Sequence, residues 1–190
     1  MSTVVEPTTT GEAPSRADSF RPIAVPSGVV AVAAITAAAV ALITFDLSAR
    51  AFVAAFFAAV LVVLAAVDLE RRIIPNRIVL PAGVVVLLGD IAAEPHRWKE
   101  WTIAAFGSFF VVLAVCLGTR GGVGMGDAKL AFLLGAGLGW AVAGAALVAT
   151  LATFVVSVGV LAKHGLEARK ETIPFGPFLV LGALVSLYLS

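Results

Sequence analysis

Cysteine and charge are both scarce in this sequence. Cys116 is the only cysteine, which excludes an internal disulfide and a zinc site built from several cysteines. Only 13% of the residues are charged, whereas 61% are hydrophobic, and a soluble domain is nearer about a quarter charged. No block of basic residues suggests nucleic acid as a partner. The composition therefore favours a chain that is surrounded by lipid.

The sequence also lacks the motifs of several enzyme classes. It contains no H-E-x-x-H of a metalloprotease, no G-x-S-x-G and no S-x-x-K of a serine hydrolase. The glycine-rich stretch "RGGVGMGDAKL" (Arg120–Leu130) is not a phosphate loop, because Ala128 and not glycine precedes Lys129. We therefore expect no nucleotide, no metal and no cofactor.

Long apolar runs occupy most of the chain after residue 27. A helix that crosses a bilayer needs about 20 mostly apolar residues, and runs that are apolar all round favour helices over a barrel. We predict an all-α, polytopic membrane protein with about seven spans, six being the alternative. The predicted spans are Gly28–Phe45, Ala51–Val67, Ile78–Ala93, Trp101–Leu117, Leu130–Gly139, Ala141–Ala162 and Phe175–Leu189.

Residues 1–27 are rich in Thr, Pro, Ser and Glu, which predicts a disordered tail before a single transmembrane domain at 28–190.

The apolar run Leu130–Ala162 would be about 50 Å long as one helix, which is too long for a hydrocarbon core of about 30 Å. We expect it to turn at "GAGLGW" (Gly135–Trp140), with a short first helix and with Trp140 at the membrane interface.

Charge predicts the orientation. With seven spans, ten of the 13 Lys and Arg residues fall on the side of the N-terminal tail and three on the other. Positive charge marks the cytoplasm, so we place the tail on the cytoplasmic side of the inner (plasma) membrane. His96 and His164 then lie on opposite sides and cannot share a metal ion.

Two carboxylates fall at the same cytoplasmic boundary. Asp68 ends the second predicted span and Asp127 opens the fifth. Two carboxylates that share a proton can activate water and protonate a leaving amine, as in aspartic proteases. The alternatives are that Asp127 only caps a helix and that Asp68 is a boundary charge beside Arg71 and Arg72. Intramembrane acids also serve as relays in transporters, although those usually lie deeper.

Three stretches resemble the prepilin peptidases, a family of intramembrane aspartic proteases. "GMGDAKL" (Gly124–Leu130) is similar to the family's G-x-G-D motif, "DLERRIIPN" (Asp68–Asn76) to its first motif, and "IPFGPFL" (Ile173–Leu179) to its C-terminal motif. The resemblance implies that Asp68 and Asp127 are the catalytic pair and that the substrate is a type IV prepilin or a related pseudopilin, cut on the cytoplasmic side. A non-catalytic pilus-assembly scaffold of the same fold is a further alternative.

The resemblance is to the short, Flp/Tad-type members. Larger members carry an additional domain with paired C-x-x-C motifs that methylates the new N-terminus, so we expect no methylation by this chain. The oligomeric state is not indicated.

Other residues of the three motifs either line the site or only shape helix ends. We interpret Lys129 either as an anchor in the membrane interface or as a charge that holds Asp127 ionised. We expect Cys116 to be a small buried residue. The remaining candidates are Gly124, Gly126, Pro75, Asn76, Pro174, Gly176 and Pro177.

Overall fold

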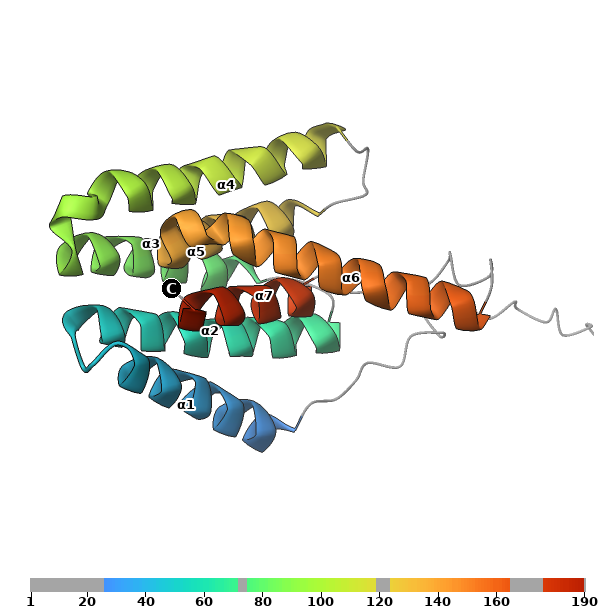
Figure 1. Cartoon of the computed structure of the whole chain (residues 1–190), viewed down its shortest axis with the longest axis horizontal. Coiled ribbons are helices and arrows are strands. Elements are labelled where there is room, and N and C mark those ends of the chain that lie inside the picture. Colours follow the sequence, from blue (N-terminus) through green and yellow to red (C-terminus); the bar gives the residue numbers. More distant parts are fainter. Residues whose placement is uncertain (1–25, 72–74, 119–123, 165–175, 190) are drawn as a thin grey trace, which may run out of the picture.

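The computed structural model describes residues 26–71, 75–118, 124–164 and 176–189, and within these residues the chain is all-α, as predicted (Figure 1). The tail up to residue 25, which we predicted to be disordered, lies outside this part. Short 3₁₀ turns η1 (Pro95–Arg97) and η2 (Gly139–Ala141) separate two of the helix pairs. The helices are α1 (Ser27–Thr44), α2 (Ala49–Arg71), α3 (Asn76–Ala93), α4 (Trp98–Gly118), α5 (Met125–Leu138), α6 (Val142–His164) and α7 (Gly176–Leu189).

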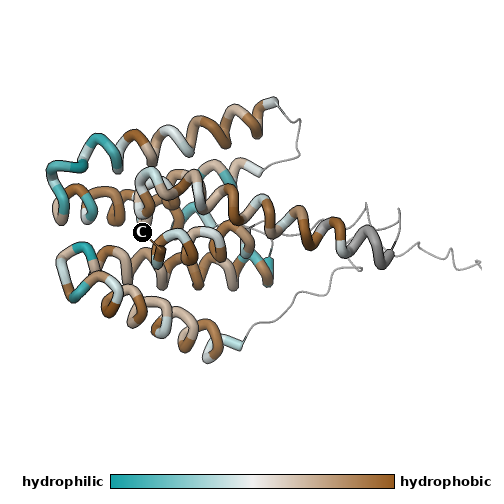
Figure 2. Tube along the Cα trace, in the orientation of Figure 1, coloured by the Kyte–Doolittle hydropathy of each residue, from teal (hydrophilic) through white to brown (hydrophobic). Residues whose placement is uncertain are grey.

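The length of the helices and the apolar side chains on their surface identify the molecule as an integral membrane protein. Five described stretches are long and apolar enough to cross a bilayer. Large apolar side chains such as Val32, Phe110 and Leu151 are more than half exposed on them, which a soluble surface would not tolerate over so wide an area. Figure 2 shows apolar residues along the helices and hydrophilic ones near the helix ends.

Five stretches are fewer than the seven crossings that we predicted. The α5–η2–α6 segment forms one apolar stretch, Met125–Val156, and α7 is a shorter apolar helix. The predicted turn inside this stretch is confirmed at Gly139, whose φ of 55° is in the left-handed region that favours glycine. Trp140, next to the turn, is 60% exposed, as an interface anchor would be.

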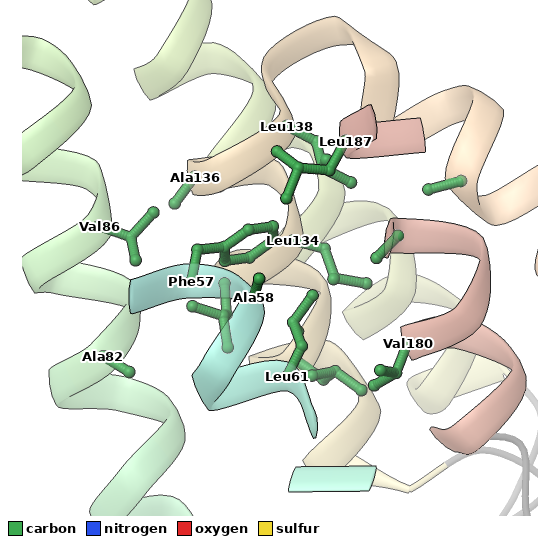
Figure 3. Close-up of a cluster of buried hydrophobic side chains, with 14 of the residues drawn as sticks. Phe57, Ala58, Leu61, Ala82, Val86, Leu134, Ala136, Leu138, Val180 and Leu187 are labelled. Carbon is green, nitrogen blue, oxygen red and sulfur yellow. The ribbon is translucent and has the colours of Figure 1, made fainter. Parts of the chain in front are cut away.

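Helix α5 is the centre of the bundle. It begins at Met125, five residues before the predicted span, and every residue from Leu130 to Leu138 is buried. Its 14 residues are about 21 Å long, so it is short, as predicted. Figure 3 shows Phe57 and Leu61 of α2, Val86 of α3 and Val180 of α7 around it. A helix that is apolar all round needs such complete burial by neighbours or lipid.

Small residues allow the close approach of helices in this bundle. A Cβ atom on Gly135 of α5 would meet the Ala104 carbonyl oxygen and the Ser108 hydroxyl of α4. The Ser108 hydroxyl lies 2.7 Å from the Ala131 carbonyl oxygen, which links the two helices by a hydrogen bond. Lipid supplies no hydrophobic force between helices, so close backbone packing and such bonds hold them together. Gly135 is thus a packing glycine.

An ion-pair cluster connects the helices at the end of the bundle that carries η1 and η2. Arg97 donates to both oxygens of Glu100, at 2.9 and 2.8 Å, and to Glu94 at 2.9 Å. The guanidinium groups of Arg50 and Arg97 lie 5.0 and 4.8 Å from the centre of the buried Trp101 ring. We call this the ion-pair end. The opposite end, where α2 ends and α5 begins, we call the carboxylate end (Figure 1).

The packing of α4 on α5 gives a stability test. We expect Gly135→Ala to lower the free energy of unfolding by about 1–3 kcal/mol, because the added methyl group displaces the α4 backbone. Thermal or denaturant unfolding of the purified protein in detergent measures the change. Gly159→Ala is the matched control, because a Cβ there meets nothing within 4 Å. Equal stability of both variants would contradict the packing role of Gly135.

Candidate active site

Asp68 continues the buried stripe of α2. Phe57, Leu61 and Leu64 are at most 2% exposed, and Asp68 follows them at helical spacing with 8% exposure. The sequence therefore places a carboxylate at a position where the pattern of the helix calls for an apolar residue. Burial of a charge is costly unless it is paired or neutralised, so this position indicates a specific role.

Asp127 lies in the first turn of α5 and caps that helix. Its carboxylate accepts a hydrogen bond from the Gly124 N–H at 3.3 Å, and its own N–H donates to the Gly124 carbonyl oxygen at 3.0 Å. Gly124 is extended, with φ −80° and ψ 148°, which is the usual backbone of an N-cap. Gly124 is therefore the N-cap residue, and Asp127 supports the cap from the third position of the helix instead of being the N-cap itself. The Asp127 side chain is only partly buried.

Both carboxylates lie at the same level of the bundle. Helices α2 and α5 run in opposite directions (Figure 1) and touch where a Cβ on Gly137 would be 2.8 Å from the Phe57 ring. Asp68 is eleven residues beyond Phe57, and Asp127 is ten residues before Gly137, which corresponds to about 16 and 15 Å along the two axes. The two acids therefore occupy the same depth at the carboxylate end.

A groove runs from Asp127 along the bundle surface. Its volume is about 580 Å³, and it is lined by α4 on one side, by α6 on the other, and by α5 between them. Asp127 is the only charged residue among its described lining residues. A partly buried carboxylate thus adjoins an apolar groove, an arrangement that suits contact with an apolar ligand.

Cys116 contacts the site, which the sequence did not suggest. Its thiol donates to the Gly124 carbonyl oxygen at 3.3 Å and thereby connects the last turn of α4 to the cap of α5. The side chain is partly exposed, so the prediction of a small buried residue is wrong. No local pattern identifies such a contact, because it depends on how α4 and α5 come together in space.

The remaining predicted residues lie at helix ends. Pro75 is the N-cap of α3 and Asn76 its first residue. Gly176 and Pro177 open α7, whereas Pro174 lies outside the described residues. These positions agree with a role in shaping helix ends.

Two candidates lie within α5, beside Asp127. Gly126 is in the first turn of α5 and is partly buried. Lys129 makes no ion pair within the described part of the chain. This favours the interpretation of Lys129 as an anchor in the membrane interface over that of a charge paired with Asp127. Of the described candidates, Gly124 is the one whose contact with Asp127 the structure shows.

No group of three or more His, Cys, Asp or Glu side chains that could hold a metal ion occurs among the described residues.

Curated relatives resemble most of the chain. The prepilin leader peptidase/N-methyltransferase of Burkholderia pseudomallei (strain K96243) is 34% identical over 158 residues, which are 80% of this chain and 50% of the relative. The protein of the same name from Bacillus subtilis (strain 168) is 27% identical over 149 residues, 76% of this chain and 58% of the relative. The Aeromonas salmonicida protein is 28% identical over 134 residues, 67% and 46%.

The chain spans about half the length of these relatives, and no solved structure matches it. The model of the type IV leader peptidase family matches residues 55–162, which is more than half of the chain. The matched stretch contains both Asp68 and Asp127, whereas the "IPFGPFL" motif lies beyond its end. The chain belongs to the type IV leader peptidase family.

Proposed function

We propose that this chain is a membrane aspartic endopeptidase that removes the leader from type IV prepilins or related pseudopilins. The observation that carries the proposal is the equal depth of the buried Asp68 and the groove-lining Asp127 on antiparallel helices. Membership of the family and the names of the relatives support the substrate class. Asp127 is the only acidic residue among the described residues that line the groove.

The reaction needs the two carboxylates to share one proton, since like charges in contact resist double ionisation. The ionised carboxylate takes a proton from water while the water oxygen bonds to the scissile carbonyl carbon. The protonated carboxyl gives its proton to the leaving nitrogen as the C–N bond breaks. Both proton transfers are general acid–base steps that each contribute about 10²–10⁴-fold.

The helix ends suggest which acid activates the water. Asp127 lies at the N-terminus of α5, where the helix dipole and the Gly124 N–H favour a negative charge. Asp68 lies near the C-terminus of α2, where the dipole disfavours one. We therefore assign the first deprotonation of water to Asp127 and the shared proton of the resting enzyme to Asp68.

The carboxylate end faces the cytoplasm in this proposal. Arg71, Arg77 and Lys129 lie at that end among the described residues. Lys163 belongs to the last turn of α6, and Arg169 and Lys170 follow that helix in the sequence. Positive charge of this kind is typical of cytoplasmic loops of inner-membrane proteins. A prepilin whose basic leader stays in the cytoplasm would thus present its scissile bond at the correct depth.

The central test removes each carboxylate without changing its shape. We expect Asp68→Asn and Asp127→Asn each to lower the rate of precursor cleavage at least about 10²-fold, because each removes one acid–base group. Co-expression with a pilin precursor, followed by gel separation of precursor and mature pilin, measures the rate.

Asp46→Asn is the matched control. Asp46 lies at the ion-pair end with φ 53°, a conformation that Asn also adopts readily, so this variant should cleave as the wild type does. Normal processing by either Asp68→Asn or Asp127→Asn at ordinary membrane levels would refute the enzyme and leave the scaffold or transporter reading.

The fate of the new N-terminus is a second test. Cys116 is the only cysteine in the 190 residues, so this chain has no pair of C-x-x-C motifs. We expect the mature pilin made by this chain alone to have a free, unmethylated N-terminal amine. Mass spectrometry of the product measures this, and a product heavier by one methyl group would contradict the expectation.

A further inference from the structure

The groove beside Asp127 is lined by several small residues. We call it the α4–α6 groove. Its floor includes Ala131 of α5, and its walls include Ala104 and Gly107 of α4 and Ala143 and Ala146 of α6. Residues this small allow the backbone of another helix to come close in lipid. The walls are therefore shaped like half of a helix–helix interface.

The polar side chains that line the groove are few. The Ser108 hydroxyl lies 2.7 Å from the carbonyl oxygens of both Ala104 and Ala131, so its proton is used within the bundle. The Asp127 carboxylate accepts the bond from the Gly124 N–H and is partly exposed at the end of the groove. The lining thus favours an apolar occupant that ends at a polar, reactive position.

The length of the groove corresponds to a segment of helix. Its α4 wall runs from Ile103 to Val115, which is about 18 Å or three helical turns. Ile103 and Val111 on its rim are 54% and 65% exposed. An apolar helix of about twelve residues can therefore lie in it from the side of the lipid.

The groove contains space that the bundle itself does not use. A Cβ atom on Gly107 would meet nothing within 4 Å, whereas one on Gly135, one helix away, would collide with the α4 backbone. Glycine at 107 is therefore not required by the packing of the chain. The open space beside Gly107 can instead accommodate a helix that packs on the bundle from outside.

We propose that the α4–α6 groove holds the apolar transmembrane helix of the substrate, with the scissile peptide just beyond its inner end at Asp127. The proposal rests on the proposed function and adds the path by which the substrate enters. The neighbours that bury α5 from Leu130 to Leu138 leave its open side between α4 and α6, so the substrate helix approaches Asp127 from that side.

The first experiment fills the groove from its own wall. Gly107→Leu places a side chain in the open space, and we expect at least a tenfold lower initial rate of precursor cleavage at unchanged thermal stability. Gly159→Leu is the matched control, because Gly159 also lies inside a helix with nothing within 4 Å but does not line the groove. It should cleave at the wild-type rate.

The second experiment detects the occupant directly. A photoreactive amino acid at position 107, in the Asp127→Asn background that retains uncut substrate, should crosslink a purified pilin precursor through its apolar helix. The same group at position 159 should not. A crosslink only to a second copy of this chain, or only to lipid, would overturn the proposal.

The outcomes separate the two proposals. If the wild type cuts the precursor and both aspartate variants fail, the protease stands. If Gly107→Leu then cleaves the precursor at the wild-type rate and no crosslink forms at position 107, the proposal that the groove holds the substrate helix is rejected and the proposed function is not affected. If the wild type does not cut the precursor, or an aspartate variant still does, the proposed function itself fails.

Discussion

The close packing of α4 against α5 is the constraint on which the rest of the structure depends. A glycine at 135 and the hydrogen bond from Ser108 to Ala131 bring the two backbones together, and α2 and α3 close the other sides of α5. In lipid, helices associate through such close contacts because the solvent offers no hydrophobic force between them. The short central helix that results carries Asp127 in its first turn, so the packing of the bundle sets the position of that carboxylate.

The two ends of the bundle use their charges differently. At the ion-pair end, Arg97 joins Glu94 and Glu100, and two guanidinium groups stack on Trp101. These bonds connect the end of α3 to the start of α4 and hold this end of the bundle together. At the carboxylate end, an acid occupies a core position of α2 and another caps α5 beside an apolar groove. Ionisable groups within membrane spans are costly and usually functional. Asp90 of α3 is also buried, near the ion-pair end, so what distinguishes the carboxylate end is the acid that lines the groove.

The sequence was sufficient to predict the helices, the break near Gly139, and the placement of Asp68 and Asp127 at the ends of two helices. Length, hydropathy and turn residues are local properties, and each of these features depends on them. The start of α5 at Met125 was missed because the glycines and charges before Leu130 look like a loop. The complete burial of α5, the contact from Cys116 to Gly124 and the α4–α6 groove were not predictable, since helices that are apolar all round carry no periodicity that reveals their neighbours.

The proposed function requires that the side chains at 68 and 127 meet between α2 and α5. Cysteines at both positions, in a Cys116→Ser background, test it directly by reaction with a short bifunctional thiol reagent in native membranes, because two residues whose carboxylates share a proton can lie too far apart for a direct disulfide. The account predicts a crosslink as efficient as that of a reference pair at 57 and 137, where the two helices touch. No crosslink between 68 and 127, under conditions in which the reference pair is crosslinked completely, would contradict it.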